Sequence, residues 1–103
     1  MVISFSIVPV GAGTELREPL AKILDLIDKS GLPYRTNAMS TEIEGDWDQV
    51  MAVVKAAHDL GRTFTGRVLT HIAIDDRAGF TGRLDGKRKD VEAILGKKLE
   101  RKK

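Results

Sequence analysis

Apolar residues recur along this chain first at every second position and then at helical spacing, and this change of period limits its fold more than any other feature. In segment 2–10, Ile3, Phe5 and Ile7 alternate with Ser4 and Ser6. Alternation with a period of two is typical of a strand with one apolar face. The sequence therefore predicts a strand over residues 2–10, which Gly11-Ala12-Gly13 ends.

A helix and two short strands are predicted next. Thr14 is the expected N-cap of this helix, and Ser30-Gly31 followed by Pro33 is the expected stop. Tyr34 to Ala38 and Ser40 to Glu44 are extended segments that we expect to pair as a hairpin. The helix is indicated by apolar residues on one face, namely Leu16, Leu20, Ile23, Leu24 and Ile27.

The second half of the chain repeats the change of period. Asp46 and Gln49 form a predicted capping box at the start of a helix that closes at Gly61. Arg67 to Asp75 is predicted to be the last strand, and a basic helix is expected after Gly82. The apolar face of the second helix is expected to hold Trp47, Val50, Met51, Val54 and Ala57, and that of the third Val91, Ile94, Leu95 and Leu99.

This order of elements predicts an α+β fold, the ferredoxin-like βαββαβ sandwich with a four-stranded antiparallel sheet plus an added C-terminal helix. Residues 1–103 are expected to form a single domain. Right-handed crossovers place both connecting helices on one face of such a sheet, so the other face stays open.

The open face is the first candidate site. The apolar residues of the first strand are expected to meet the helices, which turns Ser4, Ser6 and Val8 to the open face. In the last strand, Val68, Ile72 and Ile74 are expected to face the helices, which turns Leu69, His71 and Ala73 the other way. Because the first and last strands are neighbours in this topology, Ser6 and His71 are expected to converge.

Composition excludes several classes of site. The chain has no cysteine, so disulfides and cysteine metal sites are excluded, and its two histidines have no recognised ligand spacing, so no metal site is expected. A net charge of +2 argues against a nucleic-acid partner, and the basic segment Arg83 to Lys103 is interrupted by acidic residues. No leader or membrane segment is recognisable, so a cytoplasmic location away from membranes is expected.

The hairpin segment 36–46 is rich in hydroxyls, amides and carboxylates. Such groups provide directional donors and acceptors within one turn, which suits the binding of a polar heterocycle. Spacing alone is explained more simply by turn chemistry with a helix cap.

Four segments together carry a resemblance to a known family. They are Val8 to Gly11, Tyr34 to Asp46, Lys55 to His58 and Val68 to Arg77, of which the part from Met39 to Gly45 is the most specific. The chain resembles the small thiamine-binding protein family from Val2 to about Leu99. The resemblance implies a ferredoxin-like domain that forms homodimers or homotetramers and binds thiamine or a related pyrimidine, without known catalysis and without a cofactor.

The resemblance and the residues together suggest a ligand site at the open face or a subunit interface. Glu42 would face the cationic thiazolium, and Met39 would provide an adaptable apolar contact. The remaining predicted ligand-binding residues are Ser6, Thr36, Asn37, Ser40, Thr41 and His71.

Three other interpretations remain open. In the first, the domain is a regulatory module that binds another small metabolite. In the second, it is an enzyme that acts on a thiamine-related pyrimidine and uses His71 or Glu42 as a general acid or base. In the third, it is a structural unit whose polar open face is an interface between subunits. A buffering, carrying or sensing role for the vitamin is the first hypothesis.

Overall fold

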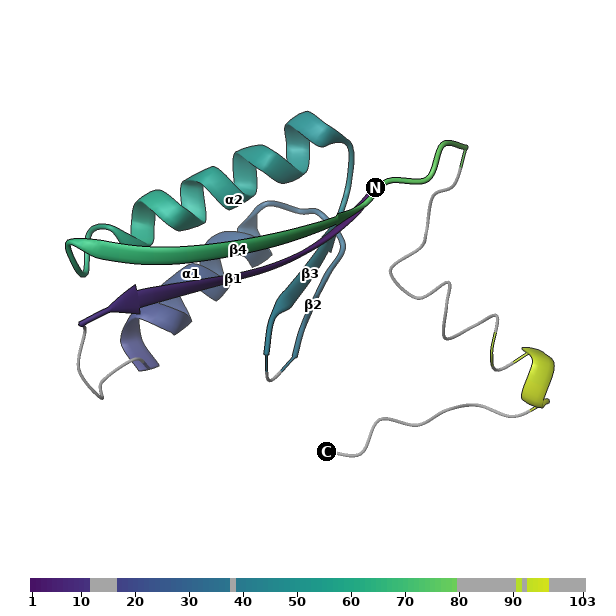
Figure 1. Cartoon of the computed structure of the whole chain (residues 1–103), viewed down its shortest axis with the longest axis horizontal. Coiled ribbons are helices and arrows are strands. Elements are labelled where there is room, and N and C mark those ends of the chain that lie inside the picture. Colours follow the sequence, from purple (N-terminus) through teal and green to yellow (C-terminus); the bar gives the residue numbers. More distant parts are fainter. Residues whose placement is uncertain (12–16, 38, 80–90, 92, 97–103) are drawn as a thin grey trace.

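A computed structural model describes residues 1–11, 17–37, 39–79, 91 and 93–96. The elements are β1 (Val2–Val10), α1 (Arg17–Lys29), β2 (Tyr34–Thr36), β3 (Thr41–Glu44), α2 (Trp47–Gly61) and β4 (Arg67–Asp75) (Figure 1). They form a four-stranded sheet in the order β2-β3-β1-β4, in which all neighbouring strands are antiparallel. The predicted α+β fold, with its βαββαβ order and four-stranded antiparallel sheet, is confirmed.

Two predictions concern residues that lie wholly or mostly outside the part of the chain that the structure describes. Thr14, the expected N-cap of α1, lies outside the described residues. The added C-terminal helix also lies mostly outside them, although Val91 and residues 93–95 are helical.

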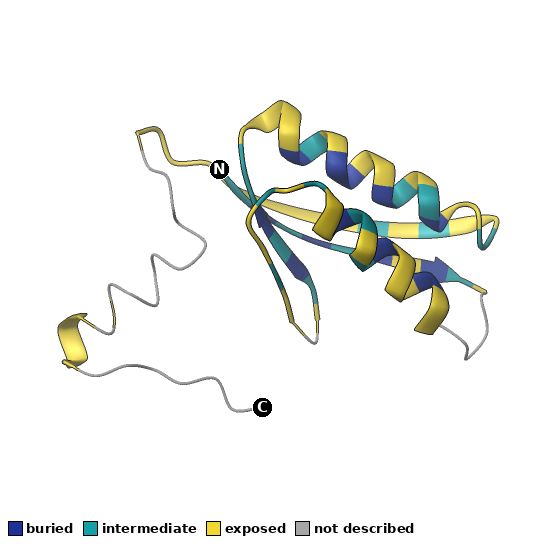
Figure 2. Ribbon diagram, turned by 180° about the vertical axis from the view of Figure 1, so that it is seen from behind, coloured by how far each residue is buried: buried dark blue, intermediate teal, exposed yellow. Residues whose placement is uncertain are grey.

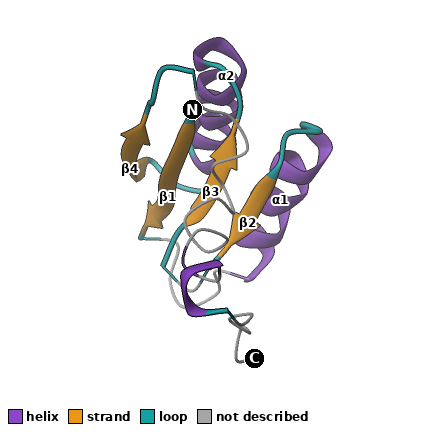
Figure 3. Cartoon of the chain, turned by 90° about the vertical axis from the view of Figure 1, so that its right-hand side faces the viewer, coloured by secondary structure: helices purple, strands orange, loops and turns teal. Residues whose placement is uncertain are grey.

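Both helices cover the same face of the sheet (Figure 3). On that face Ile3 lies opposite Ile74 and Phe5 opposite Ile72, because directly paired residues of antiparallel strands share a face. The alternation seen in the sequence thus places the apolar set of β1 under the helices. The buried core consists of Ile3, Phe5, Ile7, Ile23, Ile27, Ile43, Val50, Val53, Val54 and Ala57.

The other face of the sheet carries the residues expected there. Ser6 is the register partner of His71, and Val8 is the partner of Leu69. The predicted convergence of Ser6 and His71 is confirmed.

Local signals define the ends of the helices. The Asp46 carboxylate accepts a hydrogen bond from the Gln49 backbone N–H at 2.8 Å, and the Gln49 side chain accepts one from the Asp46 N–H at 3.1 Å. This is the predicted capping box. After α1, Gly31 has φ of +76°, a left-handed conformation that glycine adopts with little strain.

Leu20 and Ile94, expected on apolar helix faces, are 43% and 85% exposed. Trp47 was expected on the buried face of α2 but is 54% exposed. It is the first residue of the helix, so it precedes the turn that rests on the sheet, where Val50 is fully buried. Val53 takes a buried place instead.

Strand β4 is covered incompletely. Ile72 and Ile74 point to the helix side, yet they are 40% and 44% exposed. Figure 2 shows most of β4 in the colour of exposed residues, whereas β1 beside it alternates with buried positions. The helices therefore cover the middle of the sheet better than its β4 edge.

Candidate functional site

A cavity of about 310 Å³ lies between α1, the second half of β1 and the turn of the β2–β3 hairpin. Its volume is at the lower end of the range for sites that hold small molecules, which is roughly 300–1,000 Å³. The cavity is lined by Phe5, Ser6, Ile7, Val8, Pro9, Leu20, Ile23, Leu24, Ile27, Thr36, Asn37, Met39, Ser40 and Thr41.

The cavity exists because two neighbouring strands differ in length. Strand β3 pairs with β1 only from Val2 to Phe5, whereas β1 continues to Val10 beside β4. Figure 1 shows the hairpin turning away while β1 runs on next to β4. From Ser6 onward, β1 has no strand partner on its β3 side among the described residues. Its main-chain groups on that side are therefore candidate donors and acceptors for a ligand.

The walls of the cavity are mostly apolar. Helix α1 contributes Ile23 and Ile27, which also belong to the core, together with Leu20, which is 43% exposed. From the sheet, Phe5 and Ile7 contribute buried side chains. An aromatic or methylated ring fits such walls, because apolar surface gains free energy when it leaves water.

The hairpin turn supplies polar groups at one end of the cavity. The hydroxyls of Thr36 and Thr41 share a hydrogen bond of 3.2 Å, and Thr41 is buried. Ser40 accepts a hydrogen bond from the Ser4 hydroxyl at 3.0 Å. A hydroxyl both donates and accepts, so each of these groups keeps capacity for a further partner.

Asn37 and Glu42 form a third polar pair at the hairpin. The side-chain amide of Asn37 donates to the Glu42 carboxylate at 2.9 Å, and the Asn37 backbone N–H donates to the Ser40 carbonyl at 2.8 Å. Glu42 itself lies outside the cavity lining, opposite Ser4 on the open face. Its carboxylate thus holds a cavity residue in place from the adjoining surface.

The structure brings six of the eight predicted site residues into the lining, and it leaves Glu42 and His71 beside the cavity. His71 lies on the open face next to Ser6, which belongs to both surfaces. Met39 lines the cavity mouth and is 86% exposed. The lining residues, the Glu42 carboxylate and the open face are thus contiguous along β1 and β3.

Sequence reasoning missed the contribution of α1. Leu20, Ile23, Leu24 and Ile27 were assigned to the core only, because a helical stripe does not distinguish a core contact from a cavity wall. The unequal lengths of the first strand and the hairpin strand could have indicated a cavity, since a long strand beside a short one leaves part of its edge unpaired.

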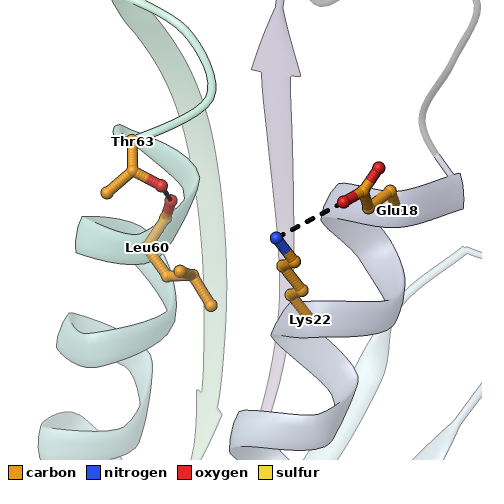
Figure 4. A network of polar contacts seen from close by, with 4 residues as sticks. All are labelled: Glu18, Lys22, Leu60 and Thr63. Carbon is orange, nitrogen blue, oxygen red and sulfur yellow. Dashed lines mark hydrogen bonds and ion pairs between the residues drawn. The ribbon is translucent and has the colours of Figure 1, made fainter.

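In the first half of α1, Lys22 Nζ lies 3.4 Å from a Glu18 carboxylate oxygen (Figure 4) and 5.6 Å from the centre of the Phe64 ring, which follows α2. Figure 4 also shows the end of α2, where the Thr63 hydroxyl donates to the Leu60 carbonyl at 2.6 Å.

At the other end of α1, the Tyr34 hydroxyl donates to Asp28 at 2.9 Å. This hydrogen bond raises the pKa of Tyr34, with burial and the Asp28 charge acting in the same direction. The bond joins the base of β2 to the last turn of α1, so the hairpin and the helix frame the cavity together.

Other sequence candidates have structural contacts. His58, assigned to a structural role near the end of its helix, shares a 2.6 Å hydrogen bond with Thr70 and so joins α2 to β4.

Within the described residues, no cluster of three or more potential metal ligands occurs. The described helices include none with the length and apolarity needed to cross a membrane.

The chain is similar to a known protein family, to individual relatives and to solved structures. A family model described as thiamine-binding protein matches residues 3–92. The UPF0045 protein of Mycobacterium bovis is 38% identical over 96 residues, covering 92% of this chain and 94% of its own length. The crystal structure of a hypothetical protein from Methanocaldococcus jannaschii superposes with a TM-score of 0.79 at 31% identity, covering 87% of this chain and 93% of that one. A domain of unknown function from Bacillus cereus superposes with a TM-score of 0.74 at 30% identity, covering 84% of each chain.

Proposed function

The chain belongs to the thiamine-binding protein family, and from this premise we propose that it binds thiamine or a related pyrimidine without catalysing a reaction. One observation carries the proposal: the cavity of about 310 Å³ combines aliphatic walls with a cluster of hydroxyl and amide groups at one end. A methylated aminopyrimidine needs both features, since its ring is apolar and its edge forms hydrogen bonds.

The polar end of the cavity suits the edge of the pyrimidine ring. Thr36, Asn37 and Ser40 lie together on the hairpin turn and are the proposed partners of the ring nitrogens and the amino group. The aliphatic side chains of α1 are the proposed contacts of the ring face.

The charge of thiamine gives Glu42 a role. A cationic thiazolium is attracted by a nearby carboxylate, and Glu42 lies just outside the cavity with Asn37 bonded to it. The thiazolium end is therefore proposed to extend toward the open face, where Ser6 and His71 also lie.

Self-association belongs to the same proposal. We propose a homodimer or homotetramer, because the open face mixes apolar side chains such as Leu69 and Val8 with the polar groups of the site. A second copy covering this face would shield a bound ligand from water. The proposed physiological role is to buffer, carry or sense the vitamin in the cytoplasm.

A second candidate function rests on the Asn37–Glu42 hydrogen bond. Because this carboxylate already has a partner and lies outside the cavity, the lining itself consists of neutral groups. That composition favours a neutral heterocycle over a cation, as in a regulatory module for another small metabolite.

Calorimetric titration with blocking variants tests the proposed cavity. Leu20→Trp adds an indole at a cavity wall that is already partly exposed, so we expect the dissociation constant for thiamine to rise at least about tenfold, a change of about 1.4 kcal/mol. Lys55→Trp adds the same group to α2 at a side chain that is 79% exposed, and it is the matched control. Equal affinity in both variants would contradict binding in this cavity.

Incubation with thiamine tests the absence of catalysis. The proposal expects the recovered ligand to be chemically unchanged, as measured by chromatography and mass. Turnover that is lost in His71→Ala would instead support an enzyme acting on the pyrimidine.

A further inference from the structure

The sulfur atoms of this chain all belong to its three methionines, because the sequence contains no cysteine. Met1 and Met51 are partly buried and pack against the hydrophobic core. Met39, in contrast, is 86% exposed on the turn between β2 and β3. An oxidant in solution must reach the sulfur atom to react with it, so Met39 is the methionine expected to react first.

Met39 is also part of the cavity lining. A hydrogen bond of 2.8 Å from the Asn37 backbone N–H to the Ser40 carbonyl closes the turn that carries it. A thioether is flexible and polarisable, and it makes favourable contacts with aromatic rings. Met39 therefore suits contact with the ring of a bound ligand, between two polar residues that line the same end of the cavity.

Oxidation would change both the polarity and the hydrogen bonding at this position. A sulfoxide is polar, so the apolar contact with the ligand ring is lost, and its oxygen accepts hydrogen bonds. The Asn37 amide has two N–H groups, of which one donates to Glu42. The Ser40 hydroxyl accepts from Ser4 and still has a proton to donate. A sulfoxide thus competes for the donors that the proposed function assigns to the edge of the pyrimidine.

We propose that Met39 is an oxidation site through which hydrogen peroxide regulates the cavity, and that its sulfoxide lowers the affinity for the ligand. The peroxide O–O bond breaks, one oxygen atom bonds to the thioether sulfur, and the other leaves with both hydrogen atoms as water. The sulfur is oxidised by two electrons and the peroxide is reduced. A methionine sulfoxide reductase reverses the change, using two thiols that become a disulfide and releasing the oxygen as water. The inference rests on the proposed function, because it concerns regulation of the same site.

Peroxide treatment of the full-length chain, followed by mass mapping of its peptides, tests the selectivity. We expect Met39 sulfoxide to form at least about tenfold faster than Met51 sulfoxide, because Met51 packs against the core. Saturating thiamine is expected to slow the oxidation of Met39 and to leave that of Met51 unchanged, since a bound ligand limits access to the cavity. Equal oxidation rates at the two methionines, or a Met39 rate that thiamine does not change, would overturn the proposal.

Titration calorimetry before and after treatment tests the effect on binding. We expect oxidation to raise the dissociation constant for thiamine about five- to tenfold, and the reductase with a dithiol to restore it. Peroxide is expected to weaken binding by the same factor in the control Met51→Leu. In Met39→Leu it is expected to leave the dissociation constant at that variant's own untreated value, because leucine is not oxidised. Circular dichroism verifies that each sample is folded.

The outcomes separate this inference from the proposed function. A reduced chain that does not bind thiamine would overturn both, whereas unchanged affinity after complete oxidation of Met39 would overturn this inference alone. A loss of affinity that peroxide also produces in Met39→Leu would assign the effect to another residue, and the inference would again be wrong.

Discussion

At the scale of single residues, Asn37 and Glu42 connect the cavity to the open face. The Asn37 amide both lines the cavity and donates to the Glu42 carboxylate, so the charge of Glu42 acts beside a neutral site. A cationic ligand and a neutral one are therefore expected to respond differently to this carboxylate.

Glu42→Gln removes the charge while its amide oxygen still accepts the hydrogen bond from Asn37. We expect the dissociation constant for thiamine to rise about five- to tenfold, because a charge-assisted contact contributes roughly 1–1.4 kcal/mol. The neutral aminopyrimidine fragment of thiamine is expected to bind both proteins equally. Titration calorimetry with both ligands measures the difference, and an equal loss for both would show that the charge of Glu42 is not what binds the cation.

Ile27 belongs both to the core and to the cavity wall. It is 1% exposed, and Ile27→Ala would remove buried methyl and methylene groups next to an existing cavity. We expect the free energy of unfolding to fall by about 3 kcal/mol, as for other large-to-small core changes. Urea denaturation measures this loss, with Leu20→Ala at the exposed part of the same wall as the control. A loss no larger than that of the control would mean that α1 packs less tightly than its contacts indicate.

At the scale of elements, the start of α2 fixes the end of the hairpin that carries the polar groups. Only a single glycine separates β3 from Asp46, the N-cap residue. The capping box satisfies main-chain N–H groups of the first turn, so the direction of the helix relative to β3 is well determined.

Asp46→Ala removes the accepting carboxylate of this box. We expect the free energy of unfolding to fall by about 1 kcal/mol, the usual contribution of an N-cap. Asp48→Ala, in the first turn of the same helix, is the control and is expected to cost only a few tenths of a kcal/mol. Thermal unfolding of both variants checks the order, and a larger loss in Asp48→Ala would contradict the capping role.

Much of this element-level organisation could be predicted from the sequence. Alternation in β1 and β4 reveals strand and face together, which is why the pairing of Ser6 with His71 was predictable. The capping box was equally visible because it is a local signal between Asp46 and Gln49.

Other features depend on tertiary placement, which no local pattern contains. The cavity arises where α1 lies over the part of β1 that β3 does not reach, so its helix wall was not predicted. The exposure of Ile72 depends on how far α2 extends over β4, and that of Trp47 on where the helix first meets the sheet. Apolarity alone therefore overestimated burial at these positions.

At the scale of the whole molecule, the two faces of the sheet differ in how far they are covered. The helices cover one face of the sheet (Figure 3) and bury the core there, whereas Val8 and Leu69 on the other face are 44% and 42% exposed. The proposed ligand lies on the β3 side of β1, and the proposed second copy covers the adjoining open face.

Backbone amide NMR during a thiamine titration tests whether thiamine occupies the cavity between α1, β1 and the hairpin turn. We expect saturable shift changes concentrated at Asn37, Ser40 and Thr41, at Ser6–Val8 and at Leu20–Ile27, which meet at the cavity. Amides on the outer surface of α2, such as those of Lys55 and Asp59, are expected to stay unchanged. A saturable titration with no shift changes in any of these segments would contradict binding in this cavity.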